Sequence, residues 1–445
     1  MHIRPAGPMR TDGTGLQKIA NRRTSTAAVR RLRAVALILG ALSTLRMIPS
    51  AHAEPLNVLH WWTSDSERRA ADRLVQQLAS QGVAWHDDAI PGGGGGAAIK
   101  VLTGRVLAGE APDVAQVIGR TLTDWADLGL VLPLDDVAQK GHWRQAMFPV
   151  VLQTVSRGGR IMAAPLGVHR INTLLYNHHV WAQLRLAPPR TWRDVEAAAK
   201  TMRAHGVTPL AWSDEPWQIA TVFETLLLSE GGPELYAQLA STQGWAAWQD
   251  ARVVAALNRL RWLRDLDDEP TTEQPWTASA RRLQSGAAGM LIMGDWARGE
   301  LQAWGEQAGL DFDCVPVPQT AGMHLYSIDT LAMLAGHDAR RADQEHMAQI
   351  LAQPATQMAY NQAKGSVPVR MDIDPSQLDA CARDSWQTLS NAASALLPSI
   401  AHRMAAVEST REAMGGVLYR FMKTRSVTPQ QAQSQLLAIV RGAGQ

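Results

Sequence analysis

The chain has 445 residues, and its 43 Lys and Arg residues against 41 Asp and Glu residues give a formal net charge of +2. Nine of these basic residues and one acidic residue lie in residues 1–53, so residues 54–445 carry 34 basic and 40 acidic residues and a net charge near −6. Nucleic-acid binding draws on clustered positive charge, so this composition argues against that partner. A stretch of 392 residues exceeds what one hydrophobic core usually serves, which predicts two lobes.

Residues 1–53 have the pattern of a secretory signal peptide. An arginine-rich start is followed by an apolar run over residues 34–45 and by Ala51-His52-Ala53. The run is shorter than the roughly 20 residues of a membrane span, and Ala-x-Ala is typical of a signal peptidase site. We expect cleavage after Ala53 and export of the rest of the chain. Paired arginines leave both the general secretory and the twin-arginine route open.

Residues 56–78 predict a strand, a tight turn and a helix. Residues 56–62 are apolar, which is typical of a buried strand, and apolar residues recur at helical spacing from Ser66 onward. The turn carries Trp61, Trp62 and Glu67, and in a parallel α/β sheet it lies where ligands bind. Aromatic faces beside hydroxyl and carboxylate groups suit a sugar ring. Two alternatives stay open here, since Ser64 and Glu67 also fit a capping box and one of the two indoles can face the core.

Further elements follow in chain order. Strands are expected at residues 83–85, 111–117 and 289–293, helices at 97–107, 191–204 and 217–229, turns at 92–96 and 118–125, a hairpin at 158–160, and helices from 371 to the C-terminus. The glycine run at 92–96 lacks the phosphate-loop pattern, which favours a flexible turn. Residues 161–176 are extended but contain Pro165 and Gly167, which indicates a crossing between lobes. Residues 326–334 and 364–370 are expected to form two more crossings.

Cys314 and Cys381 are the two cysteines of the chain. Disulfides form in oxidising compartments, so we expect these two to be bonded, with two free buried thiols as the alternative. The histidines show neither the H-E-x-x-H pattern nor Cys/His ligand spacing. We therefore expect no metal site, and the sequence suggests no cofactor.

Several separated motifs together resemble one family. They are HWWTSDSE at His60, GGGG at Gly92, VAQ at Val114, VHRIN at Val168, EPWQ at Glu215 with TVFE after it, GDWA at Gly294, SID at Ser327, KGSVPVR at Lys364 and LPSIAHRMA at Leu397. In this order they resemble the periplasmic solute-binding proteins of ABC sugar importers, and among them the glucose-binding branch. The resemblance covers essentially all of residues 54–445. That branch also places a disulfide where the two cysteines fall.

The resemblance implies an α/β fold of the periplasmic binding protein type, class II, with a ligand cleft between two lobes joined by hinge crossings. The N-terminal lobe is then expected to comprise residues 54–166 and 329–370, and the C-terminal lobe residues 167–328 and 371–445. The implied function is capture of glucose or a related aldohexose in the periplasm by a monomer that delivers it to ABC transporter permease subunits. No enzyme activity is implied.

The family's sugar contacts correspond here to Trp61, Trp62, Glu67, Trp296, Asp329, Lys364 and His402, with Trp217 as a possible further contact. Trp62 and Trp296 would sandwich the sugar ring. Glu67 and Asp329 would each accept charge-assisted hydrogen bonds from two hydroxyls. Each of these roles is what the resemblance implies.

Two possible contact positions depart from the glucose pattern. Ile118 stands where glucose binders carry lysine, and Ser327 stands where they carry asparagine; Asp65-Ser66 also replaces Gly-Gly. An unpaired sugar hydroxyl at Ile118 would cost roughly 1 to 3 kcal/mol, unless a group such as Arg120 replaces the missing donor. A disaccharide or a modified sugar therefore remains an alternative to glucose.

A secreted glycoside hydrolase is a second class of function. It would use paired carboxylates, for which Glu67 and Asp329 could be imagined. No separate acid/base motif appears, and the ordered motifs match binding proteins, so this alternative ranks lower. On a chemoreceptor role the sequence is silent.

Overall fold

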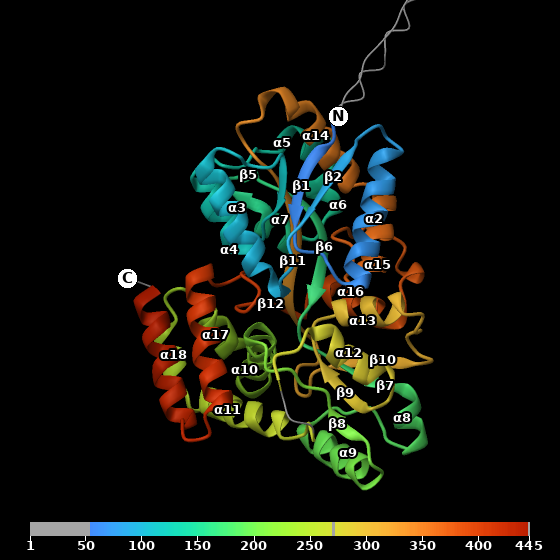
Figure 1. Ribbon diagram of the computed structural model, residues 1–445, viewed down its shortest axis with the longest axis vertical. Coiled ribbons are helices and arrows are strands. Elements are labelled where there is room, and N and C mark those ends of the chain that lie inside the picture. The colour runs from blue at the N-terminus through green and yellow to red at the C-terminus, as the bar shows by residue number, and fades with distance from the viewer. Residues whose placement is uncertain (1–53, 269–271, 444–445) are drawn as a thin grey trace, which may run out of the picture. The chain divides into compact units, whose positions relative to one another are not determined.

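The computed structural model describes residues 54–268 and 272–443, so the predicted signal peptide and its cleavage site lie outside the described residues. The described chain contains two main β-sheets, each with helices packed on it (Figure 1). This mixed α/β architecture in two lobes agrees with the predicted fold class. No helix formed by the described residues is long and apolar enough to cross a membrane.

The first lobe is built on a six-stranded sheet. Its strands are β1 (Leu56–His60), β2 (Trp85–Ala89), β3 (Val114–Gln116), β6 (Ala164–Arg170), β11 (Met323–Met333) and β12 (Ala395–Pro398). β1 runs parallel to β2 and β3, whereas β11 runs antiparallel to β3 and β6 and parallel to β12. The carboxyl ends of β1 and β3 therefore meet at one edge.

Side-chain alternation along these strands creates a core on each face of the sheet. Val58 packs in the core on one face and Leu59 in the core on the other, as the two-residue period of a strand requires. Helices α2 (Asp65–Ala79), α7 (Pro149–Val155), α14 (Arg341–Leu351) and α15 (Pro354–Lys364) cover the first face, and α3 (Gly96–Ala108) and α4 (Gly119–Asp127) the second. Short helices α5 (Asp135–Lys140) and α6 (Trp143–Ala146) and the hairpin β4 (Ser156–Arg157) and β5 (Arg160–Ile161) complete the lobe.

The second lobe is built on a four-stranded sheet in the order β10 (Phe312–Pro316), β7 (Thr173–Asn177), β9 (Ala288–Ile292) and β8 (Thr208–Leu210). Its helices are α8 (His178–Gln183), α9 (Trp192–Ala204), α10 (Pro216–Leu239), α11 (Ala251–Arg264), α12 (Trp276–Gln284), α13 (Trp296–Ala303), α17 (Glu408–Lys423) and α18 (Pro429–Ala443). Their apolar side chains share one large core with the sheet. Figure 1 shows α17 and α18 side by side next to α10 and α11.

Local sequence signals explain where α2 begins. The Ser64 hydroxyl accepts a hydrogen bond from the Glu67 amide, and the Glu67 carboxylate accepts one from the Ser64 amide. The capping-box alternative is therefore confirmed, and it is compatible with a second role for Glu67, whose other oxygen is bound by Lys364.

The first predicted crossing is confirmed. β6 belongs to the six-stranded sheet and β7 to the four-stranded sheet, and only residues 171–172 separate them. Two other predicted crossings are wrong in detail. β11 pairs within the larger sheet over its whole length, although Leu325 packs in the core of the second lobe and Ile328 in that of the first. Val367 pairs with Val168 in the larger sheet, and the chain enters the helices of the second lobe only after β12.

Two further local predictions differ from the structure. Residues 118–125 were expected as a turn, but α4 forms there because Leu122 and Trp125 are spaced to bury one helical face. The C-terminal part was expected to be helical, but β12 forms at residues 395–398 because β11 offers it a pairing edge. All of β11 and β12 pair in the six-stranded sheet, whereas the expected limits of the N-terminal lobe include only part of β11 and none of β12. The lobe limits themselves stay a prediction.

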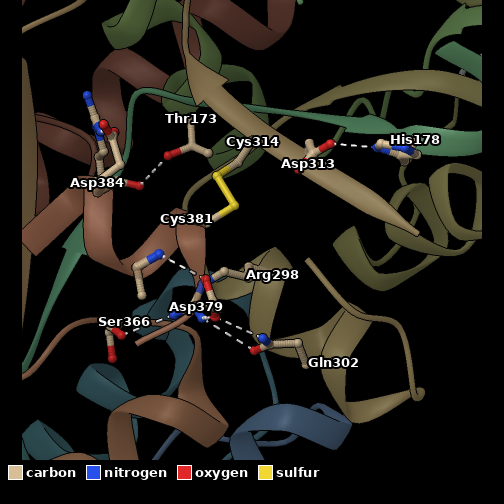
Figure 2. Close-up of a disulfide and its surroundings, with 12 residues drawn as sticks. Thr173, His178, Arg298, Gln302, Asp313, Cys314, Ser366, Asp379, Cys381 and Asp384 are labelled. Carbon is tan, nitrogen blue, oxygen red and sulfur yellow. Dashed lines mark hydrogen bonds and ion pairs between the residues drawn. A yellow bond between two sulfur atoms is a disulfide. The ribbon is translucent and has the colours of Figure 1, made fainter. Parts of the chain in front are cut away.

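The disulfide between Cys314 and Cys381 is present, as predicted. It joins β10 to α16 (Ala380–Ser390), with the two Cα atoms 5.8 Å apart. Figure 2 shows it beside the Asp379 carboxylate, which binds Arg298 and Gln302 of α13. The disulfide therefore fixes the start of α16 to β10 of the second lobe, close to α13.

Loss of this disulfide should lower the stability of the protein. It closes a loop of 67 residues, which corresponds to about 4 kcal/mol in the chain-entropy model. Replacing both Cys314 and Cys381 with Ser should lower the thermal midpoint, measured by circular dichroism, and added reductant should lower the midpoint of the unmodified protein but not of the variant. Stoichiometric labelling of the native and the denatured exported protein by a thiol reagent, without reductant, would contradict the disulfide.

Candidate functional site

A cavity of about 340 Å³ lies between the two sheets. It is lined by Trp61, Thr63, Ser64, Glu67, Gly92, Gly94, Ile118, His169, Glu215, Trp217, Pro275, Trp276, Thr277, Trp296, Ser327, Asp329, Lys364, His402 and Arg403. These residues come from the turns that follow β1, β2, β3 and β12, from β6 and β11, from the starts of α2, α10, α12 and α13, and from the end of α15. The cavity thus opens where ligands bind α/β sheets.

Of the two consecutive indoles after β1, only Trp61 lines the cavity. Trp62 is fully buried; its ring stacks on His60 at 4.8 Å between centroids and lies 5.7 Å from Tyr360. The structure therefore does not place Trp62 opposite Trp296, as the expected sandwich requires. The reason is packing, since α15 brings Tyr360 onto the face of the sheet towards which Trp62 points.

Three rings form one wall of the cavity. The Trp296 ring lies 5.1 Å from the His402 ring and 6.2 Å from the Trp217 ring, measured between centroids. The Trp217 indole nitrogen donates to the Glu215 carboxylate over 2.7 Å, which fixes the orientation of the ring. This wall offers a broad aromatic surface to a ligand, and it includes Trp217, which the sequence suggested only as a possible contact.

Asp329 is a buried carboxylate that lines the cavity. It accepts hydrogen bonds from Gln116 over 3.3 Å, from Tyr360 over 3.1 Å and from His169 over 3.2 Å. Burial alone would raise the pKa of Asp329, but attraction by His169 and Lys364 together with these hydrogen bonds lowers it to about 2. The group is therefore ionised at neutral pH.

His169 connects Asp329 to Asp295, the residue that precedes α13. Its Nδ1 lies 2.5 Å from an Asp295 oxygen and its Nε2 lies 3.2 Å from an Asp329 oxygen. Only the protonated imidazole can donate from both nitrogens. Burial works against the charge, but the two carboxylates outweigh it, so the pKa of His169 is raised above its usual value.

Lys364 and Glu67 form a second buried ion pair at the cavity wall. The Lys364 ammonium lies 3.4 Å from a Glu67 oxygen, and both side chains are largely buried. Burial lowers the pKa of Lys364, but Glu67 and Asp329 outweigh this effect and raise it. Gly365, which ends α15 with φ at 91°, allows this position, because a Cβ there would lie 2.6 Å from the Asp295 carbonyl oxygen.

His402 is buried and neutral. Its Nε2 lies 3.0 Å from the Thr221 hydroxyl of α10. Burial, and then the positive charges of Arg403 and Arg411, lower the pKa of His402 to about 3. A neutral imidazole here can pack against Trp296 and can still donate or accept one hydrogen bond.

The two departures from the glucose pattern both face the cavity. Ile118 and Ser327 line it and are 3% and 4% exposed. Neither supplies the cationic or amide donor that the glucose pattern has. Asp65 and Ser66, in contrast, do not line the cavity: their amides donate to the Glu300 carboxylate, and the Asp65 carboxylate accepts from Trp304.

Sequence reasoning missed four prominent members of the site, namely His169, Glu215, Trp276 and Arg403. A histidine in the largely apolar extended segment over residues 161–176 was the one local signal for His169. The other three lie in loops or helix starts whose position depends on the fold. No cluster of His, Cys, Asp or Glu side chains within residues 54–268 and 272–443 could hold a metal ion.

The stability of this network should depend on the charge of His169. The pKa of His169 in the folded protein is raised above the usual 6.5, so its full contribution to the free energy of unfolding is present below pH 6.5. This contribution falls as the pH rises towards the higher pKa of the folded state, by at most about 1.4 kcal/mol per pH unit. Urea unfolding between pH 6 and pH 9 should show this loss in the unmodified protein and a flatter profile in His169→Gln. Parallel profiles would contradict it.

The sequence profile of the family described as bacterial extracellular solute-binding protein matches residues 76–347. A relative from Rhizobium meliloti strain 1021, described as a probable sugar-binding periplasmic protein, is 34% identical over 88% of this chain and 94% of its own length. A relative from Brucella suis biovar 1 with the same description is 33% identical over 89% of this chain and 95% of its own length.

The fold is also similar to solved structures. One is that of the bacterial solute receptor AcbH, described as having an exclusive substrate preference for β-D-galactopyranose; it has a TM-score of 0.75, is 17% identical, and covers 88% of this chain and 99% of its own. At that identity the likeness shows the fold alone. The profile match and the two relatives place the chain in the family of bacterial extracellular solute-binding proteins.

Proposed function

We propose that this protein binds a sugar in the periplasm and delivers it to the permease of an ABC transporter. The observation that carries the proposal is the cavity, which combines an aromatic wall formed by Trp217, Trp296 and His402 with the ionised carboxylate of Asp329. A sugar presents apolar C–H faces and hydroxyl donors, and these two surfaces complement both. Because the chain belongs to a family of solute-binding proteins, it is a binding protein and not an enzyme.

The descriptions of the relatives support the same ligand class and compartment. The Rhizobium meliloti and Brucella suis proteins are described as sugar-binding and periplasmic. A periplasmic location for this chain also agrees with the signal peptide expected from residues 1–53, with cleavage after Ala53. We propose that the protein acts as a monomer whose partners are its sugar and the permease subunits.

Each polar residue of the cavity has a defined role in this proposal. Asp329 and Glu67 accept hydrogen bonds from sugar hydroxyls, and Lys364 donates to them. The network around His169 keeps Asp329 ionised and fixed before the ligand arrives, so little reorganisation is needed on binding. Trp61 lines the cavity, whereas Trp62, which the motif resemblance also implied as a contact, is buried in the core.

The ligand that we propose is glucose or a related aldohexose. Ile118 and Ser327 lack donors that the glucose pattern has, which keeps a disaccharide or a modified sugar as the alternative. Arg120, the possible substitute donor, does not line the cavity, and its backbone amide is bound to the Arg403 carbonyl. We therefore expect glucose to bind with fewer polar contacts at that corner.

Substitution of cavity residues should remove sugar binding without unfolding the protein. Isothermal titration of dialysed protein with aldohexoses and disaccharides should give saturable binding of at least one sugar. Asp329→Asn should abolish it, because a neutral amide accepts hydroxyl bonds far less strongly. Trp296→Ala should weaken it by about 1 to 3 kcal/mol, as expected for a lost aromatic contact.

Matched controls exist for both substitutions. Asp72→Asn changes an exposed carboxylate of α2, and Trp245→Ala removes a partly exposed indole outside the cavity; both should leave affinity within a factor of two. Release of product from a labelled sugar would count against the proposed binding function. Unchanged affinity of a folded Trp296→Ala protein would count against the aromatic wall.

The identity of residue 118 should set the affinity for glucose. Ile118 lies at the start of α4 and faces the cavity, so Ile118→Lys would add a charged donor there and should raise glucose affinity several-fold. Ile118→Leu is the control that keeps the apolar wall and should not. Tight glucose binding by the unmodified protein that weakens in Ile118→Lys would show instead that the isoleucine belongs to an adapted glucose site.

A further inference from the structure

Arg403 has an unusual backbone conformation next to the cavity. Its φ is 66°, in the left-handed region that residues other than glycine seldom adopt, and its side chain is 1% exposed. Such a conformation is unfavourable and persists only where surrounding contacts hold it. The contacts of Arg403 must therefore hold this backbone conformation in place.

The side chain of Arg403 joins the two lobes. Its guanidinium donates to the Gly94 carbonyl, in the glycine turn before α3 of the first lobe. It also forms a forked ion pair with Glu408 at the start of α17 in the second lobe, over 2.5 and 3.1 Å. Arg411 binds the same Glu408 carboxylate from the side. A planar guanidinium suits such a double contact.

The backbone of Arg403 makes a second contact with the first lobe. Its carbonyl accepts a hydrogen bond of 2.7 Å from the Arg120 amide in the first turn of α4. Gly119 makes this approach possible, because a Cβ at that position would lie 2.2 Å from the Arg403 carbonyl oxygen, and its own φ is 54°. One residue thus contacts both segments of the first lobe that border this side of the cavity.

The segment that carries Arg403 is firmly attached to the second lobe. The Glu224 carboxylate of α10 accepts hydrogen bonds from the Ser399 hydroxyl over 2.7 Å and from the Ile400 and Ala401 amides over 2.8 and 3.1 Å. His402 follows directly and lines the cavity. A contact with the ligand and a contact between the lobes are therefore made by adjacent residues of one fixed segment.

We propose that Arg403 is a positioning residue that latches the lobes around the bound ligand. It ties the glycine turn and the start of α4 to residues 399–403, so the lobes open on this side only after the bonds to Gly94 and Arg120 break. The inference rests on the proposed function in that the ligand is a sugar. What it adds is that the latch lowers the rate at which the ligand dissociates and leaves the rate of association unchanged.

Two substitutions test the latch from opposite sides. Arg403→Gly removes the guanidinium while keeping a residue that tolerates φ of 66°, so the backbone path is preserved. Gly119→Ala leaves Arg403 intact but pushes against its carbonyl. The matched controls are Arg411→Gln, which loses a contact with Glu408 but none with Gly94, and Gly104→Ala in α3, where a Cβ meets no atom within 4 Å.

The first measurement is sugar release by stopped-flow tryptophan fluorescence, using the sugar with the highest affinity in the titrations. Arg403→Gly and Gly119→Ala should raise the dissociation rate at least tenfold and change the association rate less than threefold, while both controls stay within twofold of the unmodified protein. Equal dissociation rates in Arg403→Gly and Arg411→Gln, or an effect on association alone, would overturn the latch.

The second measurement needs no sugar and separates failure of the latch from failure of the proposed function. Hydrogen exchange of the Arg120 amide reports its bond to the Arg403 carbonyl. In the ligand-free protein it should accelerate at least tenfold in Arg403→Gly and not in Arg411→Gln, with unchanged exchange in the β7 and β9 amides as evidence of an intact fold. Unchanged Arg120 exchange in folded Arg403→Gly overturns the latch, whereas absence of binding by the unmodified protein overturns only the sugar ligand.

Discussion

The interaction on which the junction between the lobes depends is the charged chain Asp295–His169–Asp329. One imidazole lies between a carboxylate that precedes α13 in the second lobe and a carboxylate on β11 in the first. All three groups are almost entirely buried, and a buried charge is tolerated only where it is paired and hydrogen-bonded. The pairing therefore requires β6, β11 and the end of β9 to keep one relative placement.

The same requirement prepares the cavity for a ligand. Since His169, Tyr360 and Gln116 use some of the acceptor capacity of Asp329, the carboxylate is fixed in orientation while it can still accept further hydrogen bonds from a ligand. Lys364 and Glu67 form a second buried ion pair that lines the same cavity. The polar part of the site is thus held by bonds within the protein, and the aromatic wall of Trp217, Trp296 and His402 adds contact area that needs no such pairing.

The contacts between the lobes lie on two sides of this cavity. On one side the Glu300 carboxylate of α13 accepts from the Asp65 and Ser66 amides at the start of α2, where the positive end of a helix favours an anion. On the other side Arg403 reaches Gly94 and Arg120. Lys100 and Glu412 add an exposed ion pair on that side, but pairs of this kind contribute little in water. Binding and closure are linked because His402 and Arg403 are neighbours in one segment.

What the sequence by itself determined was local or compositional. The strand, turn and helix of residues 56–79 follow from side-chain period and a capping box, the crossing at residues 161–176 follows from Pro165 and Gly167 within an extended run, and the disulfide follows from there being two cysteines. The ordered motifs led to the family and to nine of the 19 residues that line the cavity. What only the tertiary structure decided was orientation and long-range grouping. Trp61 rather than Trp62 faces the cavity because Tyr360, about 300 residues away, packs on Trp62. The roles of His169 and Arg403 depend on partners from distant segments, and no local pattern encodes which distant charge a buried side chain will meet.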